Sequence, residues 1–208
     1  MKGLLLKDTY LMAKVSRMFL VLILMFLAFW TYEGENLFFL SYPFFLSTMV
    51  PMTLISYDER DKWDVFAGTL PYSRAQMVSS KYLLGICLGV LVFAIASLVL
   101  VICRGAAGFW ETFPLLPVLL SIGLVAAGLL YPFIFWLGSE KGRVFYYVII
   151  GVVCGGSALL QFVDVASLTN LLPGGNLPAV VLTAVLAGAA VYAASWLVSI
   201  RLYTRREL

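Results

Sequence analysis

Six apolar segments, separated by short polar or charged stretches, constrain the fold of this chain more than any other feature. They cover roughly residues 15–32, 37–57, 80–103, 114–137, 144–163 and 177–200. A helix of about 20 apolar residues is long enough to cross the hydrocarbon layer of a membrane. Charged residues make up only 12% of the chain, whereas they make up about a quarter of a soluble domain. We therefore predict an all-α integral membrane protein, a single domain over residues 1–208, with six transmembrane helices.

Basic residues are distributed very unequally between the two sides of the predicted spans. Of the 14 lysines and arginines, all except Arg104 fall on the side that carries both chain termini. Because loops rich in Lys and Arg are retained in the cytoplasm, both termini are predicted to be cytoplasmic. The predicted location is the cell (plasma) membrane, in a multi-pass arrangement.

The N-terminal segment, residues 1–16, predicts an amphipathic helix that lies on the cytoplasmic leaflet. At helical spacing its apolar side chains gather on one face and its basic side chains on the opposite face. The alternative is a basic topology signal with no further role. Asp8 falls on the apolar face, and the pattern offers no reason for it.

The outer stretch, residues 164–177, is too apolar for a simple loop and too short to cross the membrane. It predicts short helices that dip into the outer leaflet and end at Pro173 and Gly174. A plain loop is the alternative.

Several kinds of chemistry have no residues to support them in this sequence. No predicted span carries an ionisable residue near its middle, which disfavours ion-coupled transport. The chain has no histidine to activate a nucleophile and no G-x-x-x-x-G-K-[ST] phosphate-binding loop. The spacing of Cys87, Cys103 and Cys154 fits neither a metal site nor a disulfide framework. We expect no catalytic site, metal or cofactor on this chain, and no nucleic-acid partner.

Two small-residue motifs in the spans, Gly85-x-x-x-Gly89 and Gly151-x-x-x-Gly155, permit close packing of membrane helices. Most such motifs pack within one subunit, so they indicate only that tight packing is possible.

The cytoplasmic segment 57–76 carries ordered signals in place of a plain loop composition. Ser56 and Glu59 match a capping box, which predicts a helix start there. Asp58 and Lys62 are spaced as a supporting i,i+4 ion pair. About three turns of helix are predicted, with one apolar face formed by Trp63, Phe66, Ala67 and Leu70.

An elbow is predicted where this helix ends. Pro71 disfavours the helical conformation at Leu70. Ser73 and Gln76 form a second capping box, which opens a helix that continues into the next span. A solvated loop that only holds the topology is the alternative, but an exposed apolar stripe usually marks a partner or the membrane surface.

The stretch "YDERDKWDVFAGTLPYSRAQMVSSKYL" resembles the cytoplasmic segment of permease subunits of small type-2 ABC exporters, among them the phenol-soluble-modulin exporter permeases. The family pattern is an E-R-D-K-W-x-x-F run followed by L-P-x-S-R and S-K-Y. It is matched here by Glu59, Arg60, Asp61, Lys62, Trp63, Phe66, Leu70, Pro71, Ser73, Arg74, Ser80, Lys81 and Tyr82. The opening "MKGLLLKD" resembles the family's N-terminus as well.

The resemblance implies an ATP-driven exporter built from two permease subunits in the lipid bilayer, identical or paired with a paralogue, and separate ABC ATPase subunits. ATP and Mg would be bound on the ATPase, and the substrate would be an amphipathic peptide or a similar hydrophobic molecule. The segment 57–76 would be a coupling helix that docks on the ATPase and acts as a lever. Its coupling residues would be Arg60, Lys62, Trp63, Phe66, Leu70, Pro71, Ser73 and Arg74.

Two other functional classes stay open from the residues alone. One is a non-transport membrane scaffold or sensor subunit. The other is an integral membrane enzyme, which the missing catalytic residues disfavour.

Overall fold

The computed structural model describes residues 2–33, 37–67, 69, 73–138, 141–142, 144, 147–148, 151 and 177–205. Within these ranges the chain forms six helices, which confirms the all-α prediction for this part of the chain. The helices are α1 (Lys2–Glu33), α2 (Leu37–Arg60), α3 (Trp63–Ala67), α4 (Arg74–Thr112), α5 (Leu115–Leu137) and α8 (Leu177–Arg205).

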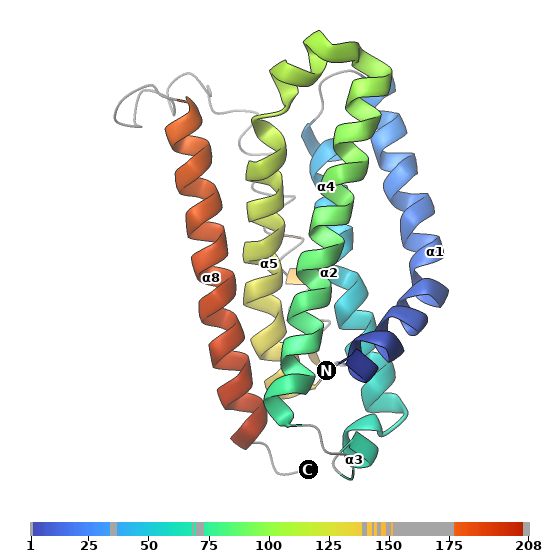
Figure 1. The fold of residues 1–208 in the computed structure, drawn as a ribbon, viewed down its shortest axis with the longest axis vertical. Helices are drawn as coiled ribbons and strands as arrows, with labels where there is room; N and C mark the ends of the chain where they lie inside the picture. Colours follow the sequence, from blue (N-terminus) through green and yellow to red (C-terminus); the bar gives the residue numbers. More distant parts are fainter. Residues whose placement is uncertain are drawn as a thin grey trace.

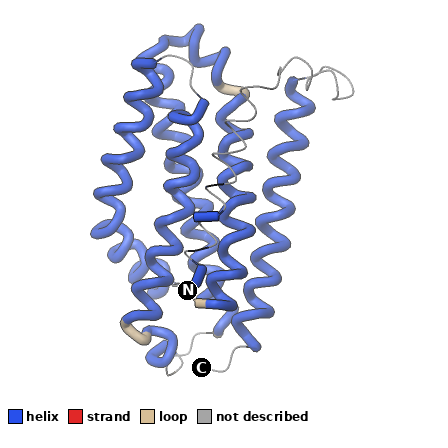
Figure 2. The backbone as a smooth tube through the Cα atoms, turned by 180° about the vertical axis from the view of Figure 1, so that it is seen from behind, coloured by secondary structure: helices blue, strands red, loops and turns tan. Residues whose placement is uncertain are grey.

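The long helices run side by side as a bundle, seen from the front in Figure 1 and from behind in Figure 2. Helix α5 packs against α8, α4 and α2, and α1 packs against α2 and α4. The start of α1, the short helix α3 and the end of α8 all lie toward one end of the bundle (Figure 1). The start of α1 and the end of α8 therefore share a side of the bundle, and that this side is cytoplasmic stays a prediction.

Four helices are long and apolar enough to cross a membrane, which makes this a multi-pass membrane protein. They are Phe38–Arg60, Arg74–Thr112, Leu115–Leu137 and Val181–Thr204. Helix α1 bends by 62° between Leu6–Ala13 and Arg17–Tyr32, and its two parts together qualify as a fifth, broken span. The predicted span 144–163 lies largely outside the described residues, and the outer stretch 164–177 wholly outside them. Six spans and an N-terminal helix on the membrane surface stay predictions.

Helix α4 is longer than a membrane requires. Its 39 residues, at about 1.5 Å per residue, would extend about 58 Å, whereas the hydrocarbon layer is about 30 Å thick. The helix breaks at Gly105, whose φ of 69° and ψ of −176° are not helical. Among the described residues, no atom of a neighbouring group lies within 4 Å of where a Cβ on Gly105 would be. The glycine is therefore favoured by its backbone conformation and not by a lack of space. Next to the break, the Arg104 guanidinium lies 4.3 Å from the centre of the Trp30 ring.

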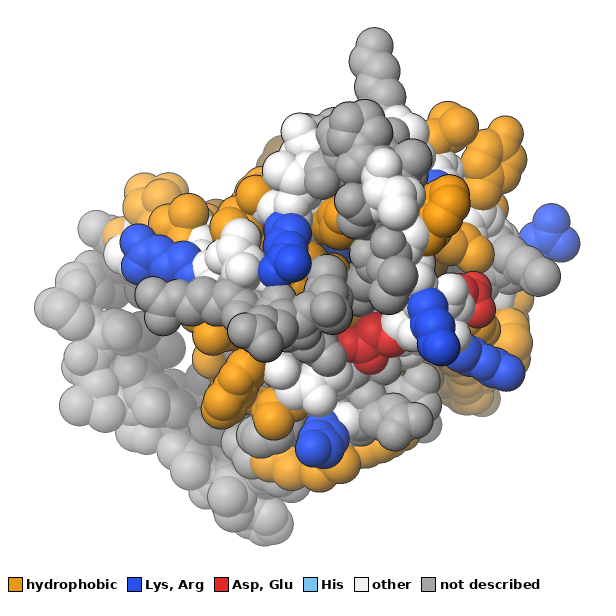
Figure 3. Space-filling view, turned by 90° about the horizontal axis from the view of Figure 1, so that it is seen from below, with side chains coloured by type: hydrophobic (Ala, Val, Ile, Leu, Met, Phe, Trp, Pro, Cys, Tyr) orange, Lys and Arg blue, Asp and Glu red, His pale blue; other side chains and the backbone are white. Residues whose placement is uncertain are grey.

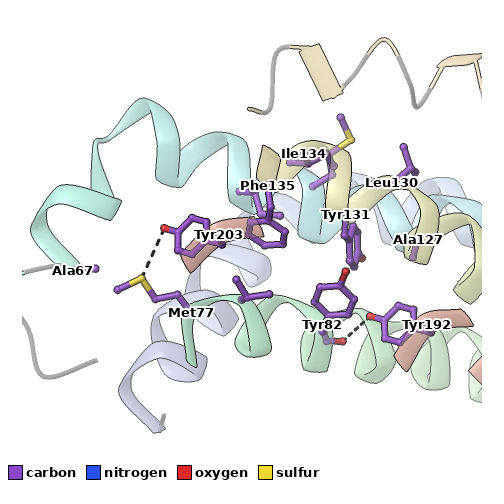
Figure 4. Packing of buried hydrophobic residues seen from close by; sticks show 13 residues of the cluster. Ala67, Met77, Tyr82, Ala127, Leu130, Tyr131, Ile134, Phe135, Tyr192 and Tyr203 are labelled. Carbon is purple, nitrogen blue, oxygen red and sulfur yellow. Dashed lines mark hydrogen bonds between the residues drawn. The ribbon is translucent and has the colours of Figure 1, made fainter. Parts of the chain in front are cut away.

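Two buried clusters hold the bundle together. The one farther from α3 gathers apolar side chains of α1, α2, α4 and α5, among them Trp30, Phe44 and Leu116. The other lies nearer α3 and joins that helix to α2, α4, α5 and α8, as Figure 4 shows. Ala67 of α3 belongs to this second cluster and is fully buried. The short helix is therefore part of the folded bundle.

A polar contact network ties α4 to α8 inside the second cluster. The Tyr82 hydroxyl lies 2.8 Å from the Ser195 hydroxyl and 2.7 Å from the Ser199 hydroxyl. The Tyr192 hydroxyl donates to the Tyr82 carbonyl oxygen at 2.8 Å. Figure 4 shows Tyr82, Tyr131 and Tyr192 directed toward one another, yet the buried Tyr131 hydroxyl has no hydrogen-bond partner among the described residues.

The motif Gly85-x-x-x-Gly89 packs within the subunit. A Cβ on Gly85 would lie 2.8 Å from the Tyr192 hydroxyl, and a Cβ on Gly89 would lie 3.0 Å from Leu120. The two glycines therefore lie directly against side-chain ends from α8 and α5, and a Cβ at either position would require those ends to move. Of the other motif, Gly155 lies outside the described residues.

Candidate functional site

Helix α2 does not end at the predicted capping box. It continues to Arg60, and the Ser56 hydroxyl donates to the Met52 carbonyl oxygen of the same helix at 3.1 Å. The prediction of a helix start at Ser56 is therefore wrong. A serine inside a helix can satisfy its hydroxyl on the carbonyl one turn back, and here that bond replaces the cap.

Helix α3 is shorter than the predicted three turns. It contains five residues, and Lys62 precedes it with a φ of 51°, in the left-handed region. The Lys62 amide donates to the Glu59 carbonyl oxygen at 3.2 Å, which closes a turn between α2 and α3. Asp58 is not paired with Lys62, because two other lysines bind its carboxylate.

The side chains of the predicted apolar stripe do not all face the same way: some pack against the bundle and one is exposed. Trp63 is half-buried and Ala67 fully buried, whereas Phe66 is 56% exposed. Leu70 and Pro71, and with them the predicted elbow, lie outside the described residues. The stripe therefore anchors α3 to the bundle through two of its members and presents Phe66 to the solvent beside the exposed Arg60 and Lys62.

The second capping box has the predicted geometry. The Gln76 amide donates to the Ser73 hydroxyl oxygen at 3.2 Å, and the Ser73 amide donates to the Gln76 side-chain oxygen at 3.2 Å. The Gln76 amide also donates to the Ser73 carbonyl oxygen at 2.9 Å, so it is shared between two acceptors of the same residue. Beside the box, Arg74 Nη1 donates to the Thr204 carbonyl oxygen at 3.1 Å, in the last turn of α8. Arg74, predicted as a coupling residue, thus contacts a carbonyl at the end of another helix.

A cluster of four charges, three of them buried and that of Lys7 half-buried, lies where α1, α2 and α4 meet beside α3. We name Lys7, Asp8, Asp58 and Lys81 the charge cluster. Lys81 Nζ donates to Asp8 Oδ1 at 2.7 Å and lies 2.6 Å from Asp58 Oδ2. Lys7 Nζ donates to Asp58 Oδ1 at 2.5 Å and lies 3.6 Å from Asp8 Oδ1. Two carboxylates and two ammonium groups therefore alternate, with no net charge.

The charge cluster is largely buried, apart from the Lys7 side chain, which is 22% exposed, and it makes further contacts. The side chain of Asp8 is 0% exposed and that of Lys81 is 8% exposed. The Ser80 hydroxyl lies 3.3 Å from Asp8 Oδ2. The Lys7 ammonium lies 4.0 Å from the centre of the Trp63 ring, close enough for a cation–π contact with α3.

Sequence reasoning missed the charge cluster, although two signals pointed to it. Asp8 stood on the apolar face of a helix without explanation, and Lys81 stood at the start of a long apolar run. Each residue alone reads as a membrane-surface charge. Asp8 and Lys81 lie 73 positions apart along the chain, and Lys7 and Asp58 lie 51 positions apart, so no local pattern can reveal either pair.

The described residues offer no candidate metal site, whereas an open hollow of roughly 670 Å³ lies between α1 and the end of α2, lined in part by Leu22, Tyr57 and Arg60. No group of three or more His, Cys, Asp or Glu side chains among them could hold a metal ion. The cavity beside the charge cluster, lined in part by Asp58, Ser80 and Lys81, has a volume of roughly 30 Å³. That space suits one or two water molecules and no substrate.

Comparison with known proteins identifies a family. The family model described as "ABC-2 family transporter protein" matches residues 3–204, nearly the whole chain. No curated protein and no solved structure matches the chain.

Proposed function

The chain belongs to the ABC-2 transporter family, and from this premise we propose that it forms the translocation path of an ATP-driven exporter. Members of this family are the membrane subunits of ABC transporters and act with an ABC ATPase subunit. The proposal adds that this chain pairs with a second permease copy or a paralogue. It also adds that the substrate is an amphipathic peptide or a similar hydrophobic molecule.

The observation that carries the coupling part of the proposal is the arrangement of α3. This helix lies at the end of the bundle where α1 starts and α8 finishes (Figure 1). Trp63 and Ala67 fix it to the bundle, and Phe66 is left exposed beside Arg60 and Lys62. An exposed aromatic on a fixed support is typical of the anchor residue of a protein interface.

The face around α3 has the polarity of a protein-binding surface. Viewed from that end, Lys and Arg side chains are spread across the molecule among apolar ones (Figure 3). We propose that this face docks on the ATPase, with Phe66 as its apolar anchor and Arg60 and Lys62 as its rim. Leu70, Pro71 and Ser73 would continue the docking surface, and Arg74 would fix the start of α4.

ATP and Mg²⁺ would be bound by the ATPase, because this sequence has no phosphate-binding loop. Closure of the ATPase would move α3 and shift the equilibrium between two conformations of the membrane helices. The exposed apolar faces of α4 and α8, which include Leu98, Ile102, Leu182 and Leu186, would contact lipid or the second permease copy.

The test uses the complex of this chain with its ABC ATPase in proteoliposomes. We expect ATP-dependent uptake of a dye-labelled amphipathic peptide. Truncation of an interface anchor costs more than about 2 kcal/mol, which exceeds tenfold in affinity. Phe66→Ala should therefore weaken ATPase binding by at least about tenfold, whereas Trp110→Ala, an exposed aromatic in the outer part of α4, should not.

Two results would contradict the proposal. Tight ATPase binding by the Phe66→Ala variant would show that α3 is not the docking element. A stable complex that hydrolyses ATP but moves neither peptides nor other amphiphiles would favour the scaffold or sensor alternative.

A further inference from the structure

We propose that the charge cluster locks the N-terminal part of α1, the end of α2 and the start of α4 into one rigid unit beneath α3. A movement of α3 would then displace α1, α2 and α4 together. This inference rests on the proposed function and assigns a positioning role to Lys7, Asp8, Asp58 and Lys81.

The four charges form a closed ring of ion pairs. Each carboxylate of the cluster lies within 4 Å of both ammonium groups, so every charge has two partners of opposite sign. The four residues come from three helices, and none of the helices can shift without separating at least one ion pair. A closed ring of this kind resists sliding of the helices past one another, which a single ion pair does not.

Three of the four charges, those of Asp8, Asp58 and Lys81, are buried. Charges held away from water contribute little net stability, because their desolvation offsets their attraction. Loss of one partner is much more damaging, since it leaves an unpaired charge in the interior. Such a cluster therefore favours one arrangement of the three helices over slightly shifted arrangements. This property suits an element that transmits movement as a rigid body.

The charge cluster is connected to α3 in two ways. Asp58 is joined to α3 through the short turn at Lys62, and Lys7 contacts the Trp63 ring directly. A displacement of α3 consequently acts on the cluster through the backbone and through a side chain. The cluster transmits it to α4 through Lys81 and to α1 through Lys7 and Asp8.

Helix α1 is bent. Lys7 and Asp8 lie in the part Leu6–Ala13, which meets the part Arg17–Tyr32 at an angle of 62°. A helix bent in this way converts a push on its short arm into a tilt of its long arm. The small volume beside the cluster leaves no room for a substrate, so a binding role does not account for the four charges.

The experiment compares variants of the complex in proteoliposomes. Asp8→Asn and Lys81→Met should retain ATPase binding and ATP hydrolysis within about twofold, but transport per ATP hydrolysed should fall at least tenfold. The double variant Asp8→Lys/Lys81→Asp, which restores opposite charges, should recover part of that loss. Glu111→Gln and Lys141→Met, two exposed residues outside the cluster, are the matched controls and should behave as the parent does.

A second measurement keeps the inference testable if a variant fails to fold. Spin labels at the exposed Tyr10 and Thr69 report the distance between α1 and the region after α3. In the parent complex this distance should be narrowly distributed and unchanged by nucleotide. In Asp8→Asn it should broaden.

The outcomes separate the two proposals. If the parent transports peptide and Asp8→Asn transports it with the same ATP cost, this inference is wrong and the proposed function stands. A Tyr10–Thr69 distance that changes with nucleotide in the parent would also overturn it. If the parent complex shows no ATP-driven transport, the proposed function fails and this inference fails with it.

Discussion

Asp8 lies on the apolar face of the N-terminal helix because that face is directed toward protein. Leu4, one turn earlier, is 3% exposed and Asp8 is 0% exposed. Asp8 is paired with Lys81 and lies near Lys7, so its charge is compensated inside the fold. A carboxylate on an apolar helical face can therefore indicate an opposite charge on a neighbouring helix.

The buried tyrosines give a prediction at the same scale. Tyr82→Phe removes the contacts of one hydroxyl with Ser195 and Ser199, and should lower the free energy of unfolding by about 0.5–1.5 kcal/mol. Tyr131→Phe should be neutral or slightly stabilising, because that hydroxyl has no hydrogen-bond partner in the described part of the chain. Thermal unfolding in detergent compares the two. A larger loss for Tyr131→Phe would show that its hydroxyl has a partner.

At the scale of elements, two capping-box motifs of the same kind correspond to different local structures. Ser73 caps α4 as its sequence predicts, whereas Ser56 lies inside α2. The difference comes from what precedes each serine. Pro71 stands two residues before Ser73, whereas the four residues directly before Ser56 contain neither proline nor glycine, and Pro51 is accommodated inside α2. A capping box therefore predicts a helix start only where the preceding residues oppose a helix.

This contrast predicts the effects of two matched substitutions. Ser73→Ala removes an N-cap acceptor and should cost about 1 kcal/mol of stability. Ser56→Ala removes only a bond from a side chain to its own helix and should cost less than about 0.5 kcal/mol. Chemical denaturation in detergent, monitored by the fluorescence of the tryptophans, gives both values. Equal losses for the two variants would refute the assignment of Ser73 as the cap.

The helices of the bundle were largely predictable, whereas the contacts between them were not. Apolar runs locate the cores of α2, α4, α5 and α8 because a membrane imposes length and polarity on each helix separately. The charge cluster joins residues 51 and 73 positions apart. Local periodicity cannot reveal such pairs. The length of α3 was overestimated for the same reason, because Asp58 and Trp63 make contacts with distant residues that the local sequence does not predict.

At the scale of the whole molecule, the distribution of basic residues predicts the orientation in the membrane. In a version with Cys87, Cys103 and Cys154 replaced by alanine, new cysteines at Asp61 and Glu111 lie in exposed positions. An impermeant thiol reagent should label position 111 in intact cells and position 61 only after permeabilisation, because the side rich in Lys and Arg is retained in the cytoplasm. Labelling of position 61 in intact cells would reverse the predicted orientation.

The shortness of α3 has a consequence for assembly. Five residues cannot form a helix in water without outside support, because helix initiation is unfavourable. Here the support comes from Trp63 against Lys7 and from Ala67 in a cluster that includes Met77, Phe135 and Tyr203. An ATPase that docks on α3 would consequently recognise only a permease whose first and last helices are already packed. Under the proposed function, docking would act as a checkpoint that withholds ATP hydrolysis from unfinished chains.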